Sequence, residues 1–115
     1  MLVEKGTDVN IQGGEYGNDL QAASTEGYKE VAQMLLEQGA DINAQGGRDG
    51  NALYGASSEG HKVMARMLLE KGADVNAQGG RYGNVLQAAS SRGNKEVTRM
   101  LLEKGAEPRY GRLWI

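Results

Sequence analysis

The chain has no cysteine and no phenylalanine, and it holds one proline, one tryptophan and one histidine among its 115 residues. The absence of cysteine excludes a disulfide framework, a thiolate zinc site and a cysteine nucleophile. The formal net charge is −2, so there is no global basic field that would hold nucleic acid or an anionic membrane. No apolar run approaches the ~18 residues of a membrane span, and the N-terminus lacks a signal-peptide pattern. These absences predict an intracellular, cytoplasmic protein with neither nucleic-acid nor membrane partners.

Glycine is abundant instead, with 18 copies, and many of them belong to a string that recurs every 33 residues. Gly-Ala-Asp-Ile-Asn-Ala-Gln-Gly-Gly begins at Gly39, returns with one change at Gly72, and has an earlier variant at Gly6. Units cut at this period share about 60–70% of their residues in any pairing, far beyond chance for unrelated segments. The full units are 8–40, 41–73 and 74–106.

The segments outside these units are pieces of further ones. Residues 1–7 match the end of a preceding unit, and residues 107–115 begin a fourth unit and then depart from it. We therefore treat residues 1–115 as a single repeat domain. Because the chain starts inside a helix pattern, the sequence favours a fragment of a longer array or a truncated gene.

Each unit carries the pattern of two helices. In the third unit, Asn84 precedes a short apolar stretch that stops at Gly93, and Asn and Gly are strong helix start and stop residues. A longer stretch follows, with apolar residues at helical spacing, and stops at Gly105. The Gly-rich connection between units predicts a hairpin-like loop with turns at the Gly pairs. We expect the short helices to be capped by Asn18, Asn51 and Asn84.

A unit of this kind cannot bury its apolar face alone and must pack against its neighbours. The 33-residue period, Leu-x-x-Ala, Gly-His, and Leu-Leu-Glu-x-Gly-Ala-Asp-x-Asn-Ala together resemble ankyrin repeats over 8–106. The resemblance implies an all-α ankyrin-repeat solenoid of helix-turn-helix units linked by β-hairpin-like loops. It also implies a non-catalytic scaffold that binds a partner protein, whose identity the sequence does not reveal.

The chain departs from the usual unit at one place. Ankyrin units commonly have Thr-Pro-Leu-His where this chain has Asn18-Asp19-Leu20-Gln21, Asn51-Ala52-Leu53-Tyr54 and Asn84-Val85-Leu86-Gln87. This variant resembles the ankyrin arrays of fungal proteins, which are often attached to NACHT or other NTPase modules that resemble immune receptors.

In an ankyrin stack, the hairpin tips and the outer face of the short helices line a concave groove that binds proteins. Along the corresponding positions the charge changes from acidic in unit one to basic in unit three, which predicts a partner with the opposite order of charge. Neutral divergence between duplicated units is the alternative explanation. The expected partner-binding residues are Gln12, Glu15, Tyr16, Thr25, Glu26, Gln45, Arg48, Asp49, Ser58, Glu59, Gln78, Arg81, Tyr82, Ser91 and Arg92.

Other motifs favour structural roles. Residues 8–19 superficially fit a calcium loop, but units two and three lack the acid at position twelve, so we interpret them as hairpins. The Gly pairs lack the Lys-Ser/Thr of a phosphate loop. His61 has no second His and no Cys to share a metal, and we expect it to make a structural hydrogen bond. The chain is thus predicted to have no catalytic residue, cofactor, metal or small-molecule substrate.

The ends of the repeat suggest a second function. Residues 113–115, Leu-Trp-Ile, would cap the last unit by covering apolar side chains of its long helix, and a frayed terminus is the alternative. Without such a cap, the chain is expected to self-associate by end-to-end stacking. In that case unit one would expose Leu20, Val31 and Leu35 to a preceding copy.

Overall fold

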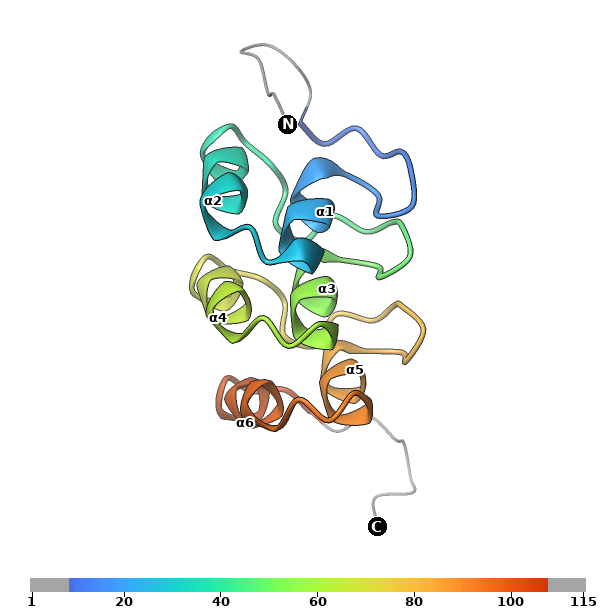
Figure 1. Cartoon of the computed structure of the whole chain (residues 1–115), viewed down its shortest axis with the longest axis vertical. Helices are drawn as coiled ribbons and strands as arrows, with labels where there is room; N and C mark the ends of the chain where they lie inside the picture. Colours follow the sequence, from blue (N-terminus) through green and yellow to red (C-terminus); the bar gives the residue numbers. More distant parts are fainter. Residues whose placement is uncertain (1–8, 108–115) are drawn as a thin grey trace.

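A computed structural model of the chain describes residues 9–107. Within this range the chain forms three helix pairs and no extended sheet. Figure 1 shows the pairs stacked one upon another, with α1, α3 and α5 in one column and α2, α4 and α6 in a second. This all-α repeat fold agrees with the sequence prediction. The helices are α1 (Asp19–Glu26), α2 (Lys29–Glu37), α3 (Ala52–Ser58), α4 (Lys62–Glu70), α5 (Val85–Ser91) and α6 (Lys95–Glu103).

The predicted asparagine caps of the three short helices are confirmed. Each Asn has extended backbone geometry, is at most 4% exposed, and accepts a hydrogen bond from the backbone N–H three residues later. These bonds satisfy first-turn donors that have no partner inside the helix. The acceptor Oδ1 atoms of Asn18, Asn51 and Asn84 lie 2.9, 2.8 and 2.8 Å from their donors.

The predicted helix ends also hold to within one residue. Helix α5 ends at Ser91, and the chain then turns at Gly93, whose φ of 75° lies in the left-handed region. A residue without a Cβ adopts this conformation at little cost, which explains why glycine ends the helix. Helix α6 likewise ends two residues before Gly105. Short helix, glycine turn and longer helix therefore follow directly from the local sequence.

The apolar core lies between the two columns of helices. Leu35, Leu53, Leu68 and Leu101 are at most 1% exposed and belong to one continuous cluster that runs through all three pairs. Helix α3 is in the middle of the stack and packs against α1, α4 and α5. Its seven residues are all buried, because neighbours cover it on both sides along the stack.

The expectation that unit one exposes Leu20 and Leu35 is wrong, and Val31 is only half-exposed. Leu20 and Leu35 are 1% and 0% exposed, because both belong to the continuous core cluster. Met34 is exposed instead, at 41%. Its equivalents in the next two units, Met67 and Met100, are 5% and 4% exposed. The neighbouring unit therefore covers the methionine position.

Polar side chains also tie each unit to the next. Asn43 donates its Nδ2 to Gly72 O (3.3 Å) and accepts from Asp74 N–H (2.8 Å). Asn10 and Asn76 make the same two bonds one unit earlier and one unit later. Three equivalent asparagines thus fix successive loops at a constant offset, which sets the spacing of the hairpins.

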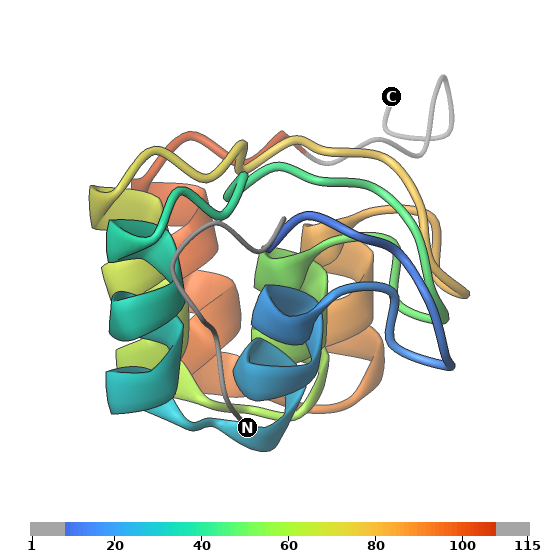
Figure 2. The same cartoon turned by 90° about the horizontal axis from the view of Figure 1, so that it is seen from above.

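The loops between units form the predicted hairpin-like projections. Each contains one isolated antiparallel bridge, at Gly13–Gly17, Gly46–Gly50 and Gln78–Asn84. Figure 2 shows that the loops extend to one side, beyond the column of short helices. The hairpins and the short helices together form the surface on which the predicted partner-binding residues lie. The expected C-terminal cap at 113–115 lies outside the described residues.

Candidate functional site

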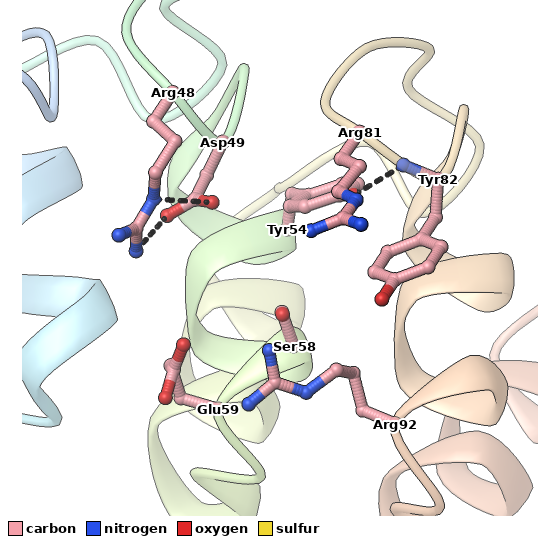
Figure 3. Close-up of a pocket in the computed structure, with 8 residues that line it drawn as sticks. All are labelled: Arg48, Asp49, Tyr54, Ser58, Glu59, Arg81, Tyr82 and Arg92. Atoms are coloured by element: carbon pink, nitrogen blue, oxygen red, sulfur yellow. Dashed lines mark hydrogen bonds and ion pairs between the residues drawn. The ribbon is translucent and has the colours of Figure 1, made fainter.

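The predicted partner-binding residues lie on the hairpins and on the C-terminal ends of the short helices. Seven of them line one pocket of about 170 Å³ between the second and third units, together with the buried residue Tyr54. Figure 3 shows that these side chains come from two hairpins and from the ends of two short helices. The structure therefore brings together positions that are up to 44 residues apart in the sequence, namely Arg48, Asp49, Ser58, Glu59, Arg81, Tyr82 and Arg92.

The remaining predicted residues lie outside this pocket. Gln12, Glu15, Glu26, Gln45, Gln78 and Ser91 are exposed, and Tyr16 is half-buried. Gln12 is not a free contact group, because its Nε2 donates to Gln21 Oε1 at 3.2 Å. These residues continue the surface on either side of the pocket.

Two predicted contact residues, Thr25 and Ser58, are only 6% exposed, so the expectation that they form an open surface is wrong. Thr25 Oγ1 lies 3.0 Å from Gln21 O and 3.1 Å from Asp49 Oδ2, which links helix α1 to the second hairpin. Both residues lie on short helices that pack against the next short helix, α1 on α3 and α3 on α5. Thr25 therefore supports the surface from beneath, and Ser58 contributes only the floor of the pocket.

At the junction of units one and two, Arg48 is surrounded by acceptors from this chain. Its guanidinium lies 3.3 Å from Glu15, 3.2 Å from Asp49 and 4.8 Å from the centre of the Tyr16 ring. The hydrogen bond to Asp49 is the largest cause of a raised Arg48 pKa. Much of the acidic charge that the sequence places at this end is thus already paired within the molecule.

The junction of units two and three has a different charge arrangement. Arg81 and Arg92 are exposed, and neither makes an ion pair with any of residues 9–107. The Arg81 guanidinium lies 5.7 Å from the centre of the ring of Tyr82, the next residue in the sequence. The basic end predicted from the sequence is therefore available to a partner, whereas the acidic end is partly neutralised.

Tyr54 is the site residue that sequence reasoning missed. It is 2% exposed, and its hydroxyl oxygen accepts a hydrogen bond from the Tyr82 N–H at 2.7 Å. Burial is the largest cause of a raised Tyr54 pKa. The available signal was the replacement by Tyr of the Gln found at the equivalent positions 21 and 87.

The Tyr54 ring lies directly beneath the third hairpin. A Cβ at Gly80 would overlap this ring, and Gly80 has a φ of 76°, so the position requires glycine for two reasons. In unit one, Gln21 instead donates from Nε2 to Gly46 O at 2.8 Å, in the second hairpin. Both side chains hold the following hairpin in place, but only the tyrosine provides a rigid aromatic wall.

His61 makes the expected structural hydrogen bond. Its Nε2 lies 3.0 Å from Thr25 O, so this nitrogen donates to a carbonyl of the preceding unit. Asn94 does the same one unit later, donating its Nδ2 to Ser57 O and Ser58 O at 2.8 and 2.9 Å. These bonds fasten each helix turn to the unit before it.

None of the helices described in residues 9–107 has the length and apolar character needed to cross a membrane.

Comparison with known proteins agrees with the repeat architecture. A family model described as ankyrin repeats, in three copies, matches residues 20–111, which is most of the chain. No curated protein matches the sequence closely enough to count as a relative.

Proposed function

We propose that this chain, which belongs to the ankyrin-repeat family, binds one partner protein through the surface formed by its hairpins and short helices. Ankyrin repeats are generally protein-protein interaction modules and are typically non-enzymatic. The proposal assigns this chain the same role, as a scaffold without a catalytic residue or a small-molecule substrate.

One observation carries the proposal. All eight residues that line the pocket stand at repeat positions where the three near-identical units differ. The units also differ at exposed positions of the long helices, such as Glu30, Val63 and Glu96, where substitutions usually cost little stability. Arginine and tyrosine, which are enriched at protein interfaces, supply five of the eight residues that line this pocket. The residue types in the pocket therefore favour an interface.

Selection of displayed protein fragments on the immobilised chain tests the proposal. Fragments that bind are measured again on the double variant Glu15→Lys, Glu26→Lys, whose changes lie on the proposed surface. The double variant Glu37→Lys, Glu103→Lys on the long helices is the control with the same change in net charge. We expect binding to be lost only in the first variant. Equal losses of binding in the two variants, or a failure to select any fragment, would contradict the proposal that this surface binds a partner protein.

Self-association by end-to-end stacking is the second candidate function. Tyr28 is 57% exposed and Met34 is 41% exposed on one end face, and Leu102 is 48% exposed near the other. Such apolar side chains mark association surfaces. Light scattering coupled to size exclusion over a hundredfold dilution tests this function, and a constant 12.3 kDa mass would exclude it.

We infer a cytoplasmic location and a fungal-type source. The absence of cysteine supports the first, since secreted small domains commonly depend on disulfides. The Gly-Asn-x-Leu-Gln-Ala-Ala-Ser variant of the unit supports the second. A fluorescent fusion expressed in a fungal host tests the location.

A further inference from the structure

We propose that the pocket between units two and three binds a carboxylate side chain of the partner protein, held between Arg81 and Arg92. This inference rests on the proposed function and adds the chemistry of one contact. The partner residue is an aspartate or glutamate in a segment that lies across the second and third hairpins.

Two equivalent arginines of successive hairpins differ in their surroundings. Arg81 stands 33 residues after Arg48, at the same position of the hairpin. Arg48 binds Glu15 from the preceding hairpin and Asp49 from its own. One unit later, the positions equivalent to Glu15 and Asp49 are occupied by Arg48 and Tyr82, so Arg81 has neither acid. The same scaffold thus presents an arginine with its carboxylates at one junction and without them at the next.

The Arg48–Glu15 pair also shows how the missing carboxylate would bind. It joins side chains on two successive hairpins at 3.3 Å, outside the helical core. A partner carboxylate that reaches Arg81 would take the place of the acid that the second hairpin lacks at position 48. Hydrogen bonds to charged groups are stronger than neutral ones, and arginine suits carboxylates because its planar donors match two oxygens.

A second arginine strengthens the same site. Arg92 caps the C-terminal end of α5, where the first two units have Glu26 and Glu59. Figure 3 shows the Arg92 guanidinium beside Ser58 and the Arg81 guanidinium beside the Tyr54 ring, and both line the same pocket. Glu59 also lines this pocket. Because Arg48 is paired with Asp49, two unpaired arginines outnumber this single acid and leave the pocket positive.

The walls of the pocket are suited to a specific contact rather than to diffuse attraction. The buried Tyr54 ring forms one side, and its bond to the Tyr82 N–H fixes the hairpin that carries Arg81. The volume of about 170 Å³ far exceeds the ~30 Å³ that one water occupies in the liquid. A carboxylate with its methylene groups can therefore enter.

Chemical-shift mapping by NMR tests the proposal on the full chain. The probe is the peptide acetyl-(Glu)6-amide, whose blocked ends remove the terminal carboxylate, and the control peptide is acetyl-(Gln)6-amide. We expect the Glu peptide to shift the side-chain Nε–Hε signals of Arg81 and Arg92 in a saturable manner. Arg81→Gln and Arg92→Gln should each weaken binding at least about fivefold, and raising the salt should weaken it further.

Arg66→Gln is the control variant, because it removes the same charge from an exposed position on α4. Binding by this variant should stay within twofold of wild type. An equal loss in Arg66→Gln and Arg81→Gln, or no shift of the two arginine signals at millimolar peptide, would overturn the inference. Circular dichroism of each variant verifies that the fold is intact.

A separate outcome distinguishes this inference from the proposed function. The displayed fragments that depend on Glu15 and Glu26 should also lose affinity in Arg81→Gln. They should contain an acidic residue whose change to Gln causes a similar loss. If fragments bind the surface and Arg81→Gln does not change their affinity, the carboxylate pocket is refuted while the proposed interaction function is still supported.

Discussion

The contact between Gly80 and the Tyr54 ring predicts that Gly80→Ala destabilises the protein more than the same change at an equivalent glycine. Gly14 stands at the same hairpin position in unit one, with a φ of 73° against 76° at Gly80. A Cβ at Gly14 meets nothing within 4 Å, whereas a Cβ at Gly80 overlaps the Tyr54 ring. The two substitutions thus share backbone strain and differ in steric overlap.

The magnitudes follow from these two contributions. An alanine in the left-handed region costs roughly 1–2 kcal/mol, and the reduced entropy of the unfolded chain offsets about 0.4–1 kcal/mol of this. Gly14→Ala should therefore cost about 1 kcal/mol. Overpacking against a buried side chain adds about 1–3 kcal/mol, so Gly80→Ala should cost about 2–4 kcal/mol.

Equilibrium urea unfolding followed by far-UV circular dichroism measures both costs. The Tyr54→Gln background is the decisive control, because Gln is the residue at the equivalent positions 21 and 87. There the cost of Gly80→Ala should fall toward that of Gly14→Ala. Equal costs for the two single variants, or an unchanged cost of Gly80→Ala without the ring, would refute the reasoning.

Three further predictions concern stability. Asn51→Ala should cost about 1 kcal/mol in urea unfolding, whereas Asn51→Ser should cost much less because the hydroxyl still accepts the Tyr54 N–H; equal costs would remove the cap assignment. Burial raises the pKa of Tyr54 in the folded state, so the unfolded chain releases this proton first. Neutral Tyr54 therefore contributes stability below about pH 10, and this contribution is lost as the pH rises further. Between about pH 9 and 11, the free energy of unfolding should fall less in Tyr54→Phe than in wild type. Asn94→Ala breaks two hydrogen bonds to the preceding unit and should cost about 1–3 kcal/mol, while Asn94→His should be milder because His61 makes the equivalent bond.

Several features were determined by the sequence alone, because they depend on short-range physics. The 33-residue period defines the repeating unit, and the asparagine caps and glycine stops define where each helix begins and ends. A capping hydrogen bond joins residues three positions apart, and a left-handed turn needs a glycine at a single position. Both can therefore be predicted without the tertiary structure. The family's known geometry then placed the candidate surface on the hairpins and short helices. Seven of its residues do line one pocket.

Only the tertiary structure decided what each of these side chains is free to do. The sequence shows Thr25 and Arg81 as variable polar positions of equal standing, yet the packing of α1 on α3 buries the first and leaves the second exposed. It shows Glu15 as a free acid, whereas stacking of the hairpins brings Arg48 from the next unit within 3.3 Å. Tyr54 became a wall of the site because its ring reaches the hairpin 28 residues onward. Burial, pairing and shape arise between units, and a pattern read along one unit does not contain the distances between units.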